Sequence, residues 1–370
     1  MSNKSDYITK LYAIKTNRME IEKLMTYQEV VASLNKKKRK KHLLFGNGFS
    51  MAFDNNIFSY NALSKFIEDS GDPMVTKLFE RLNTKNFELI MQQLDNFCEI
   101  ADLFSNDKTL VPKIKAVTEQ LKNSLIDAVK ELHPEHVFKI PDEKSESCMK
   151  FLQEYISRDG LVFSTNYDLL LYWVLIRNQV KNAIDGFGRD LETDLDSGEY
   201  IPPEDFEYSE LRWGKYKKEM TVFHLHGTLP IFDTGINIVK VEYDNAHYLL
   251  ENVKERIDNK EYPIFVTAGN GQEKLNHIMH NKYLTHCYDQ LCAIEGSLVT
   301  FGFNFGEYDH HIIDAVNKAA KMGQKVKDKL WSVYIGVYSD ENLEYINEIK
   351  DKFKCKVTPY NARTANIWNN

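Results

Sequence analysis

The sequence predicts an α/β fold, a parallel sheet of about six strands with a large helical insertion, and three observations support it. Short, continuously apolar runs alternate with segments whose apolar residues recur three and four positions apart. This alternation is typical of strands buried on both faces and separated by helices. A long middle stretch carries only the helical pattern, and clusters of glycine and polar residues directly follow the apolar runs.

The composition is that of a globular protein. The chain has 370 residues, 43% of them hydrophobic, and its 47 Lys and Arg against 54 Asp and Glu give a net charge of −7. Such a content of apolar residues excludes an intrinsically disordered chain. The acidic balance argues against a protein whose whole surface binds nucleic acid. No apolar run approaches the roughly 18 residues of a membrane-spanning helix, so we expect no membrane association.

The five cysteines are few and irregularly spaced, and the N-terminus lacks the apolar segment of a secretory leader. Both features predict a reducing, cytoplasmic location. No cysteine pair has the Cys-x2-Cys spacing of zinc knuckles and ribbons. We therefore interpret the cysteines as small core side chains and expect no metal.

The first 40 residues predict a helical extension, because apolar residues recur at helical spacing between residues 5 and 35. The basic run from Lys36 to Lys41 follows. It could bind nucleic acid or an acidic partner, but charge runs are more often merely solvated, and this one leads into a strand. Residues 41–370 are the predicted α/β domain.

Two insertions enlarge this predicted domain. The first, about 55–158, is helical, because apolar residues recur three and four apart and Gly and Pro are scarce within the helical segments. The second, about 185–218, is charged and irregular, which predicts a loop over one face of the sheet.

Six short apolar runs are the predicted strands. They are residues 42–45, 160–164, 221–226, 263–267, 297–301 and 331–337. In Rossmann-like parallel sheets, ligands bind beyond the carboxyl ends of the strands. Polar or Gly-rich clusters occupy that end of five runs, at residues 46–50, 164–168, 224–228, 267–271 and 302–309. We expect these clusters to form the rim of one site.

The clusters at 46–50 and 302–309 suit a nucleotide. In Gly46-Asn47-Gly48-Phe-Ser50, glycines would let the backbone approach a pyrophosphate, whose charge free N–H groups would bind. Gly-x-Gly is a weak signal by itself, because many tight turns contain it. The turn with Gly302 and Asn304 suits an adenosine ribose or adenine edge. The alternative for that turn is a simple strand-to-helix loop with Asp309 as the cap.

Three further positions could carry chemistry. The Asn166 amide could hydrogen-bond a sugar hydroxyl or fix a water, or the segment could cap the next helix; both hold if Asp168 caps and Asn166 stays free. His226 precedes Gly227 at a strand end and is a candidate general base, whereas His224, one pleat deeper, suits a core histidine. His310 and His311 could suggest metal, but without a second carboxylate or cysteine at ligand spacing we favour a solvated helix start.

The order of these motifs resembles the SIR2 (sirtuin) fold, and more narrowly the SIR2-like proteins of bacterial anti-phage defence. The resemblance covers roughly residues 40 to 340 and rests on four motifs in order on successive strands. They are Gly46-Asn-Gly48-Phe-Ser50, Ser164-Thr-Asn-Tyr-Asp168, His224-Leu-His-Gly227 and Gly302-Phe-Asn-Phe-Gly306.

The resemblance implies a site for NAD, with Asn166 and His226 as the catalytic residues. The implied NAD-binding positions are Gly46, Asn47, Gly48, Ser50, Thr165, Asp168, Gly302 and Asn304. Asn47 and Asn304 depart from the small residues usual in the family. The phosphate-binding and adenosine-binding positions therefore match the family's motifs less well than Asn166 and His226 do.

The absent zinc module separates two activities within the resembling group. Sirtuin deacetylases carry two Cys-x2-Cys pairs, which this chain lacks, so the resemblance favours an NADase that converts NAD to nicotinamide and ADP-ribose and defends by NAD depletion. It implies a latent activity, released by assembly as a homo-oligomer or by a HerA-type ATPase partner. A protein deacylase and a non-catalytic module that senses NAD or ADP-ribose remain the alternatives.

Overall fold

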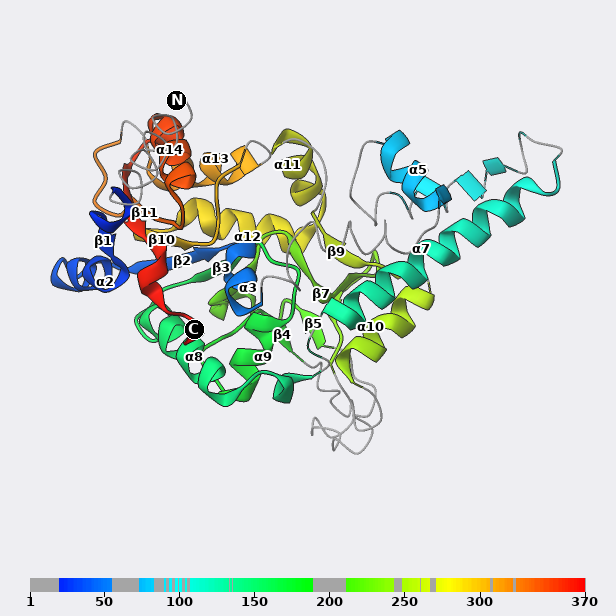
Figure 1. Ribbon diagram of the computed structural model, residues 1–370, viewed down its shortest axis with the longest axis horizontal. Helices are drawn as coiled ribbons and strands as arrows, with labels where there is room; N and C mark the ends of the chain where they lie inside the picture. Colours follow the sequence, from blue (N-terminus) through cyan, green and yellow to red (C-terminus); the bar gives the residue numbers. More distant parts are fainter. Residues whose placement is uncertain are drawn as a thin grey trace, which may run out of the picture.

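The computed structural model describes most of the chain (Figure 1). The described residues are 20–54, 73–82, 107–132, 136–188, 211–242, 248–259, 261–266, 271–306, 309–321 and 324–369, with residue 134 and scattered positions between 90 and 104. Among these residues, no helix is both long enough and apolar enough to span a membrane.

The core of the described structure is a seven-stranded parallel sheet in the order β1-β12-β11-β10-β2-β3-β6. Its strands are Met25–Thr26 (β1), Lys41–Phe45 (β2), Val162–Ser164 (β3), Val222–His224 (β6), Gly296–Phe301 (β10), Leu330–Val337 (β11) and Lys356–Asn361 (β12). Five of the six predicted runs form these strands, and the predicted α/β class is confirmed.

The strand order is that of a Rossmann fold once the two-residue β1 at the edge is set aside. From the first long strand, β2, the chain builds β3 and β6 to one side and then crosses over to build β10, β11 and β12 on the other. The order therefore reverses between β2 and β10. In open α/β sheets ligands bind at such a switch point, outside the carboxyl ends of the strands.

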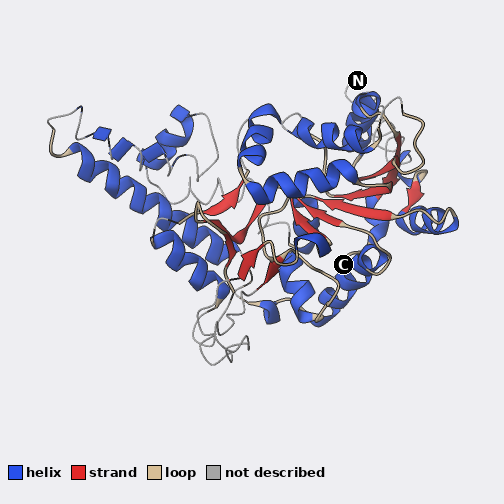
Figure 2. Ribbon diagram, turned by 180° about the vertical axis from the view of Figure 1, so that it is seen from behind, coloured by secondary structure: helices blue, strands red, loops and turns tan. Residues whose placement is uncertain are grey.

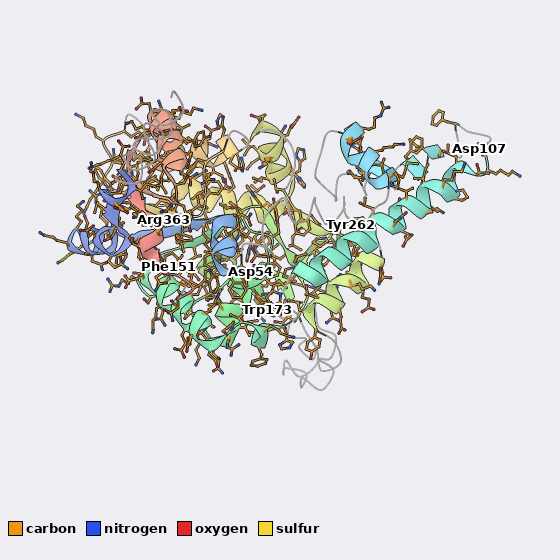
Figure 3. All side chains as sticks on the ribbon, viewed as in Figure 1. Asp54, Asp107, Phe151, Trp173, Tyr262 and Arg363 are labelled. Carbon is orange, nitrogen blue, oxygen red and sulfur yellow. The ribbon has the colours of Figure 1, made fainter. Side chains whose placement is uncertain are left out.

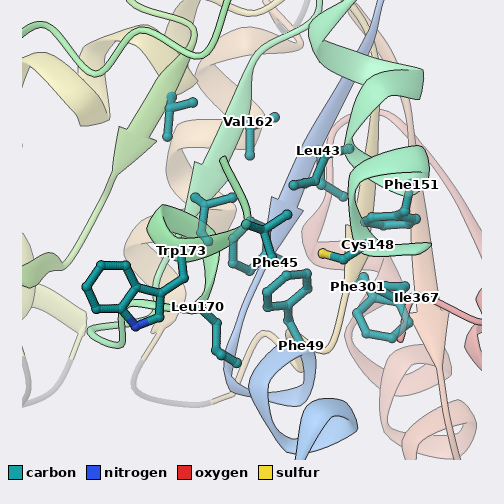
Figure 4. Packing of buried hydrophobic residues seen from close by; sticks show 14 of the residues in the cluster. Leu43, Phe45, Phe49, Cys148, Phe151, Val162, Leu170, Trp173, Phe301 and Ile367 are labelled. Carbon is teal, nitrogen blue, oxygen red and sulfur yellow. The ribbon is translucent and has the colours of Figure 1, made fainter. Parts of the chain in front are cut away.

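Helices cover both faces of the parallel sheet (Figure 2). On one face lie α2 (Tyr27–Lys36), α3 (Asn47–Phe53), α8 (Asp142–Ile156) and α9 (Leu170–Arg177). On the other lie α11 (Gly271–His280), α12 (Lys282–Ala293), α13 (His310–Ala319) and α14 (Asp340–Ile349). Alternate residues of β2 enter the two layers: Leu43 and Phe45 join the first core, which Figure 4 shows, and Leu44 joins the second.

A second, antiparallel sheet was not predicted. Its order is β4-β5-β8-β7-β9, and its strands are Phe187–Gly188, Leu211–Trp213, Ile238–Lys240, Gly227–Asp233 and Pro263–Phe265 in that order. The run at 263–267, expected in the parallel sheet, pairs antiparallel with β7 instead, so that placement was wrong. A short apolar run shows that a strand is buried but not which sheet it joins. The charged segment 185–218, expected as a loop, contains the strands β4 and β5 within its described residues, together with turn residues.

Gly227 makes the corner between the two sheets. The chain leaves β6 and enters β7 with a φ of +81° at this glycine, and a Cβ there would lie 1.8 Å from the carbonyl oxygen of Ile264. Glycine alone adopts this conformation without strain and leaves room for β9. The glycine that the sequence marks beside His226 is therefore required by the fold itself.

The helical insertion forms an arm that projects from the body of the molecule (Figure 1). Its described helices are α5 (Pro73–Leu82) and α7 (Leu110–Leu132), and α7 contacts α10 (Leu249–Asp258). Asp107 lies at the outer end of the arm (Figure 3). The predicted insertion also contained α8, which packs on the sheet as the crossover helix between β2 and β3. Other parts of the insertion lie outside the described residues.

The N-terminal segment adds to the sheet. β1 pairs with β12, and α2 is helical as predicted, whereas residues 1–19 lie outside the described residues. The basic run ends inside the fold: Lys41 is the first residue of β2 and is buried, with its Nζ 2.8 Å from a carboxylate oxygen of Glu154.

His42 is held as a neutral ring within β2. Its Nδ1 accepts a hydrogen bond from the Leu161 backbone N–H at 3.1 Å, and its Nε2 lies 2.9 Å from the Glu295 carbonyl oxygen, to which it donates. Burial lowers its pKa to about 4. Protonation of Nδ1 would break the bond to Leu161 and place a charge in the core.

We expect this histidine to make the protein less stable in acid. Between about pH 6.5 and 4 the unfolded chain binds a proton at His42 that the folded chain does not, so the free energy of unfolding falls as the pH falls, by about 3 kcal/mol for this residue over that range. Urea unfolding at pH 7 and pH 4.5 measures the loss. The variant His42→Gln should lose less stability over the same range; an equal loss would contradict this origin.

Candidate functional site

The loops that follow β2 and β10 touch at the switch point. Gly46 N–H donates to the Phe301 carbonyl oxygen at 3.1 Å, and Gly48 N–H donates to that of Gly302 at 2.9 Å. A Cβ on Gly48 would lie 2.5 Å from the Cα of Gly302, whose φ is +61°. The two clusters expected on one rim, 46–50 and 302–309, therefore meet there. Their glycines have a structural reason, since only glycine allows the strand ends this approach.

A chain of hydrogen bonds joins Ser50, Asn166 and Asp168. The Ser50 hydroxyl donates to Asp168 Oδ2 at 2.5 Å, and Asn166 Nδ2 donates to the Ser50 oxygen at 2.7 Å. A hydroxyl has a single proton, so once Ser50 gives it to the carboxylate, the oxygen can only accept from the Asn166 amide nitrogen. This fixes the amide orientation and leaves Asn166 Oδ1 buried without a hydrogen-bond partner among the described residues.

Asp168 anchors the network at the start of α9. Its second oxygen accepts the N–H of Leu170, the first residue of α9, at 2.9 Å, although the N-cap position itself is Leu169 and not Asp168 as expected. Asn166 keeps a free oxygen, as expected. Burial raises the pKa of Asp168, and the hydrogen bonds from Ser50 and Leu170 act in the opposite direction. Beside them, the Thr165 N–H and hydroxyl both donate to the Phe45 carbonyl oxygen, which ties the end of β3 to β2.

Ser50 lies in a different setting from the one expected of a phosphate ligand. Its side chain is fully buried, and its hydroxyl is shared between Asp168 and Asn166. In this arrangement it orients Asn166. The Gly46 and Gly48 N–H groups are likewise bonded to the β10 end. Asn47 is half-buried, and Asn304 is exposed between the buried Phe303 and Phe305. Residues 267–270 and Glu307 lie outside the described residues.

His226 is buried at the end of β6. The chain holds it from both sides, because Leu225 N–H donates to the Ser164 carbonyl oxygen at 2.8 Å and Val266 N–H donates to the His226 carbonyl oxygen at 3.0 Å. The ring is 2% exposed, and burial lowers its pKa well below the ordinary value, with His311 and Lys274 adding to the effect. His226 is therefore neutral at pH 7.

The ring of His311 faces that of His226. Their Nε2 atoms are 2.9 Å apart, and His311, from the first turn of α13, is 1% exposed. The expectation of a solvated helix start is therefore wrong for His311. No sequence pattern could show that this helix begins beneath the end of β6. Burial lowers the pKa of His311 to about 4, although the Asp309 carboxylate opposes the shift.

A carboxylate and an ammonium complete this cluster. Asp309 offers an oxygen within 4.8 Å of the two histidine nitrogens, so the fold supplies the carboxylate that the local spacing lacked. Lys274, on α11 and 9% exposed, places its Nζ 2.8 Å from Asp309 Oδ1. No local pattern singles out Lys274, the one lysine of the polar helix α11 in a chain rich in lysine.

His224 lies deeper, as expected of a core histidine. Its ring is 7% exposed, and burial lowers its pKa to about 4. Asp185 and Lys240 lie near it and form their own ion pair at 2.5 Å. The two histidines of one strand thus belong to different environments.

These features define an α/β protein of Rossmann strand order with two groups of polar side chains at the carboxyl ends of its strands. The chain belongs to the family described as "Domain of unknown function (DUF4917)", whose sequence profile matches residues 43–368. The match begins in β2 and ends at Trp368, which is buried and donates its indole N–H to the Phe49 carbonyl oxygen in α3 at 2.8 Å. No curated protein matches this sequence.

Proposed function

We propose that this protein hydrolyses NAD to nicotinamide and ADP-ribose. The observation that carries the proposal is the pair of prepared groups at neighbouring strand ends: a buried amide oxygen on Asn166 without a partner among the described residues, and a buried neutral imidazole on His226. Asn166 follows β3, the neighbour of β2 at the switch point, and His226 follows β6, the next strand along. Both lie at the carboxyl edge of a Rossmann-ordered sheet, the usual place for a dinucleotide. The resemblance of the four motifs to the SIR2-like group supports the same substrate.

The two groups suit the chemistry of an N-glycosidic bond. Such a bond breaks with oxocarbenium character at the ribose carbon, and a water completes the hydrolysis. The Asn166 oxygen can only accept hydrogen bonds, so in the proposal it holds a ribose hydroxyl or the attacking water. Neutral His226 takes the proton of that water or hydroxyl, a role worth roughly 10²–10⁴ in rate.

In the proposal, the backbone of residues 46–48 and of Gly302 lies directly against the pyrophosphate. The touching glycines bring the ends of β2 and β10 together at the switch point, the place where the phosphates of a dinucleotide would lie. Asn47 and Asn304 are the side chains of these loops left to contact the phosphates and the adenosine. Ser50 and Asp168 serve by holding Asn166, and Thr165 by holding the strand end.

The resemblance also supplies the biological setting of the proposal. An NADase would deplete NAD in the cytoplasm, where the five cysteines, all free in the structure, would remain reduced. We propose that the activity serves anti-phage defence and is released by homo-oligomer assembly or by a HerA-type ATPase.

The direct test is incubation of the purified chain with NAD, alone and with the product of a neighbouring ATPase gene, followed by chromatography of the products. We expect nicotinamide and ADP-ribose in equal amounts. If NAD stays intact but binds the protein in calorimetry, the protein senses NAD and does not hydrolyse it. Nicotinamide released only with an acylated peptide would indicate a deacylase.

A further inference from the structure

The His226–His311 pair has a hydrogen-bonding geometry that restricts its protonation. The two Nε2 atoms face each other at 2.9 Å, and the Nδ1 atoms of both rings are buried without a partner among the described residues. Each neutral imidazole carries one N–H. One ring must therefore donate through Nε2 while the other accepts.

A proton between the rings fits this geometry better than a metal ion. With a shared proton, the accepting ring carries its own hydrogen on Nδ1, so one buried N–H lacks a partner among the described residues. A metal bound by both Nε2 atoms would put a hydrogen on both Nδ1 atoms, and each unpaired buried donor costs about 1–3 kcal/mol. The Lys274 ammonium beside Asp309 also repels a cation.

The function proposed for His226 decides which ring donates. A general base needs a free lone pair, and Nε2 of His226 faces His311, so the lone pair must lie on Nδ1. The hydrogen of His226 then sits on Nε2 and points at His311. We propose that His311 is the positioning residue that fixes this tautomer and ring orientation of His226, an inference that rests on the NADase function proposed above.

The surroundings of His311 keep it able to accept. A protonated ring would have no lone pair on Nε2, and burial keeps the pKa of His311 near 4, so the ring is neutral at pH 7. The charged or titratable groups that face it are His226, Asp309, Lys274 and His310. Asp309 favours a proton on His311, but Lys274, which pairs with Asp309, and His310 act in the opposite direction, and burial is the largest effect.

The activity test compares two variants of His311. His311→Gln keeps an oxygen that can accept the Nε2–H of His226, whereas His311→Leu has no acceptor. We expect His311→Leu to lower kcat for NAD roughly 10²-fold or more with little change in KM, since a histidine in the wrong tautomer loses most of its activity. His311→Gln should recover at least about tenfold of that loss. His280→Gln, at an exposed position of α11, is the matched control with unchanged activity.

A second readout does not depend on activity. Nitrogen-15 NMR of histidine-labelled protein, with the His226 signals identified by their loss in His226→Gln, should show the His226 proton on Nε2 and lose that state in His311→Leu. A proton on Nδ1 of His226 would overturn the inference. So would one equivalent of zinc retained after dialysis against zinc chloride and lost in His311→Leu.

The two proposals can fail separately. If the wild-type protein hydrolyses NAD and His311→Leu does so equally fast, His311 has no positioning role while the proposed function stands. If the wild-type protein never releases nicotinamide, the proposed function falls, and the NMR tautomer still decides whether His311 holds His226 through Nε2.

Discussion

Replacement of His226 by alanine is expected to lower the rate of NAD hydrolysis by about two to four powers of ten. The change removes the imidazole that follows β6 and leaves His224 within the strand and the Asn166 network after β3 untouched. The measurement is nicotinamide released per minute at saturating NAD, with circular dichroism to show that the variant is folded. We expect NAD to bind the variant with little change, because the proposed task of His226 is proton transfer.

The pH profile gives this prediction a second, independent readout. A general base works only when deprotonated, and burial lowers the pKa of His226 well below that of an ordinary histidine. The wild-type rate should therefore persist to lower pH than an exposed histidine would allow. His280→Ala, on an exposed position of α11, is the matched control. Full turnover by His226→Ala would remove this residue from the mechanism.

Replacement of Asn166 by alanine is expected to lower the same rate by about two to three powers of ten, the loss typical when an oriented side-chain amide is removed from a reacting centre. The variant deletes the buried Oδ1 while Ser50 and Asp168 keep their mutual hydrogen bond and the cap on α9. The strand end and the helix start therefore remain in place. The folded state should unfold at nearly the same temperature as the wild-type protein.

Ser50→Ala separates the contact made by Asn166 from its orientation. That variant leaves the amide present but frees Nδ2, so we expect an intermediate loss, on the order of tenfold, the loss typical of a supporting partner. Asn347→Ala, an exposed asparagine of α14, should have no effect. Equal rates for Asn166→Ala and the wild-type protein would show that the free oxygen serves no step of the reaction.

The sequence was sufficient to predict five strands of the parallel sheet, because each of these five is a short run of apolar residues. The two-residue β1 and the half-exposed β12 were not predicted. The periodicity of the helices was equally clear, including α2, α8 and α13. The sequence was not sufficient to predict the second, antiparallel sheet. β9 is as apolar as the core strands, and only its pairing with β7 places it elsewhere. β7 begins at Gly227, separated from the end of β6 by only two residues, so the sequence does not show that a second strand in another sheet starts there.

The candidate site residues likewise fall into those that the sequence predicted and those that it did not. Asn166, Asp168 and His226 were predicted because each directly follows an apolar run, where the fold class places ligand contacts. Ser50 was predicted for its position near two glycines, but its hydroxyl is engaged with Asp168 and Asn166. Lys274 carried no local signal, and His311, noted with His310 in the sequence, was wrongly interpreted as a solvated helix start.

The sequence by itself determined the class of the fold, most strands of the parallel sheet and the edge of that sheet at which polar side chains gather, because hydrophobic periodicity is a local property of the chain. Only the tertiary structure decided which side chains meet. Ser50 and Asp168 are 118 residues apart and His226 and His311 are 85 apart, yet each pair is within hydrogen-bonding distance. Such contacts depend on the pairing of strands and the packing of helices over them, which no local pattern encodes.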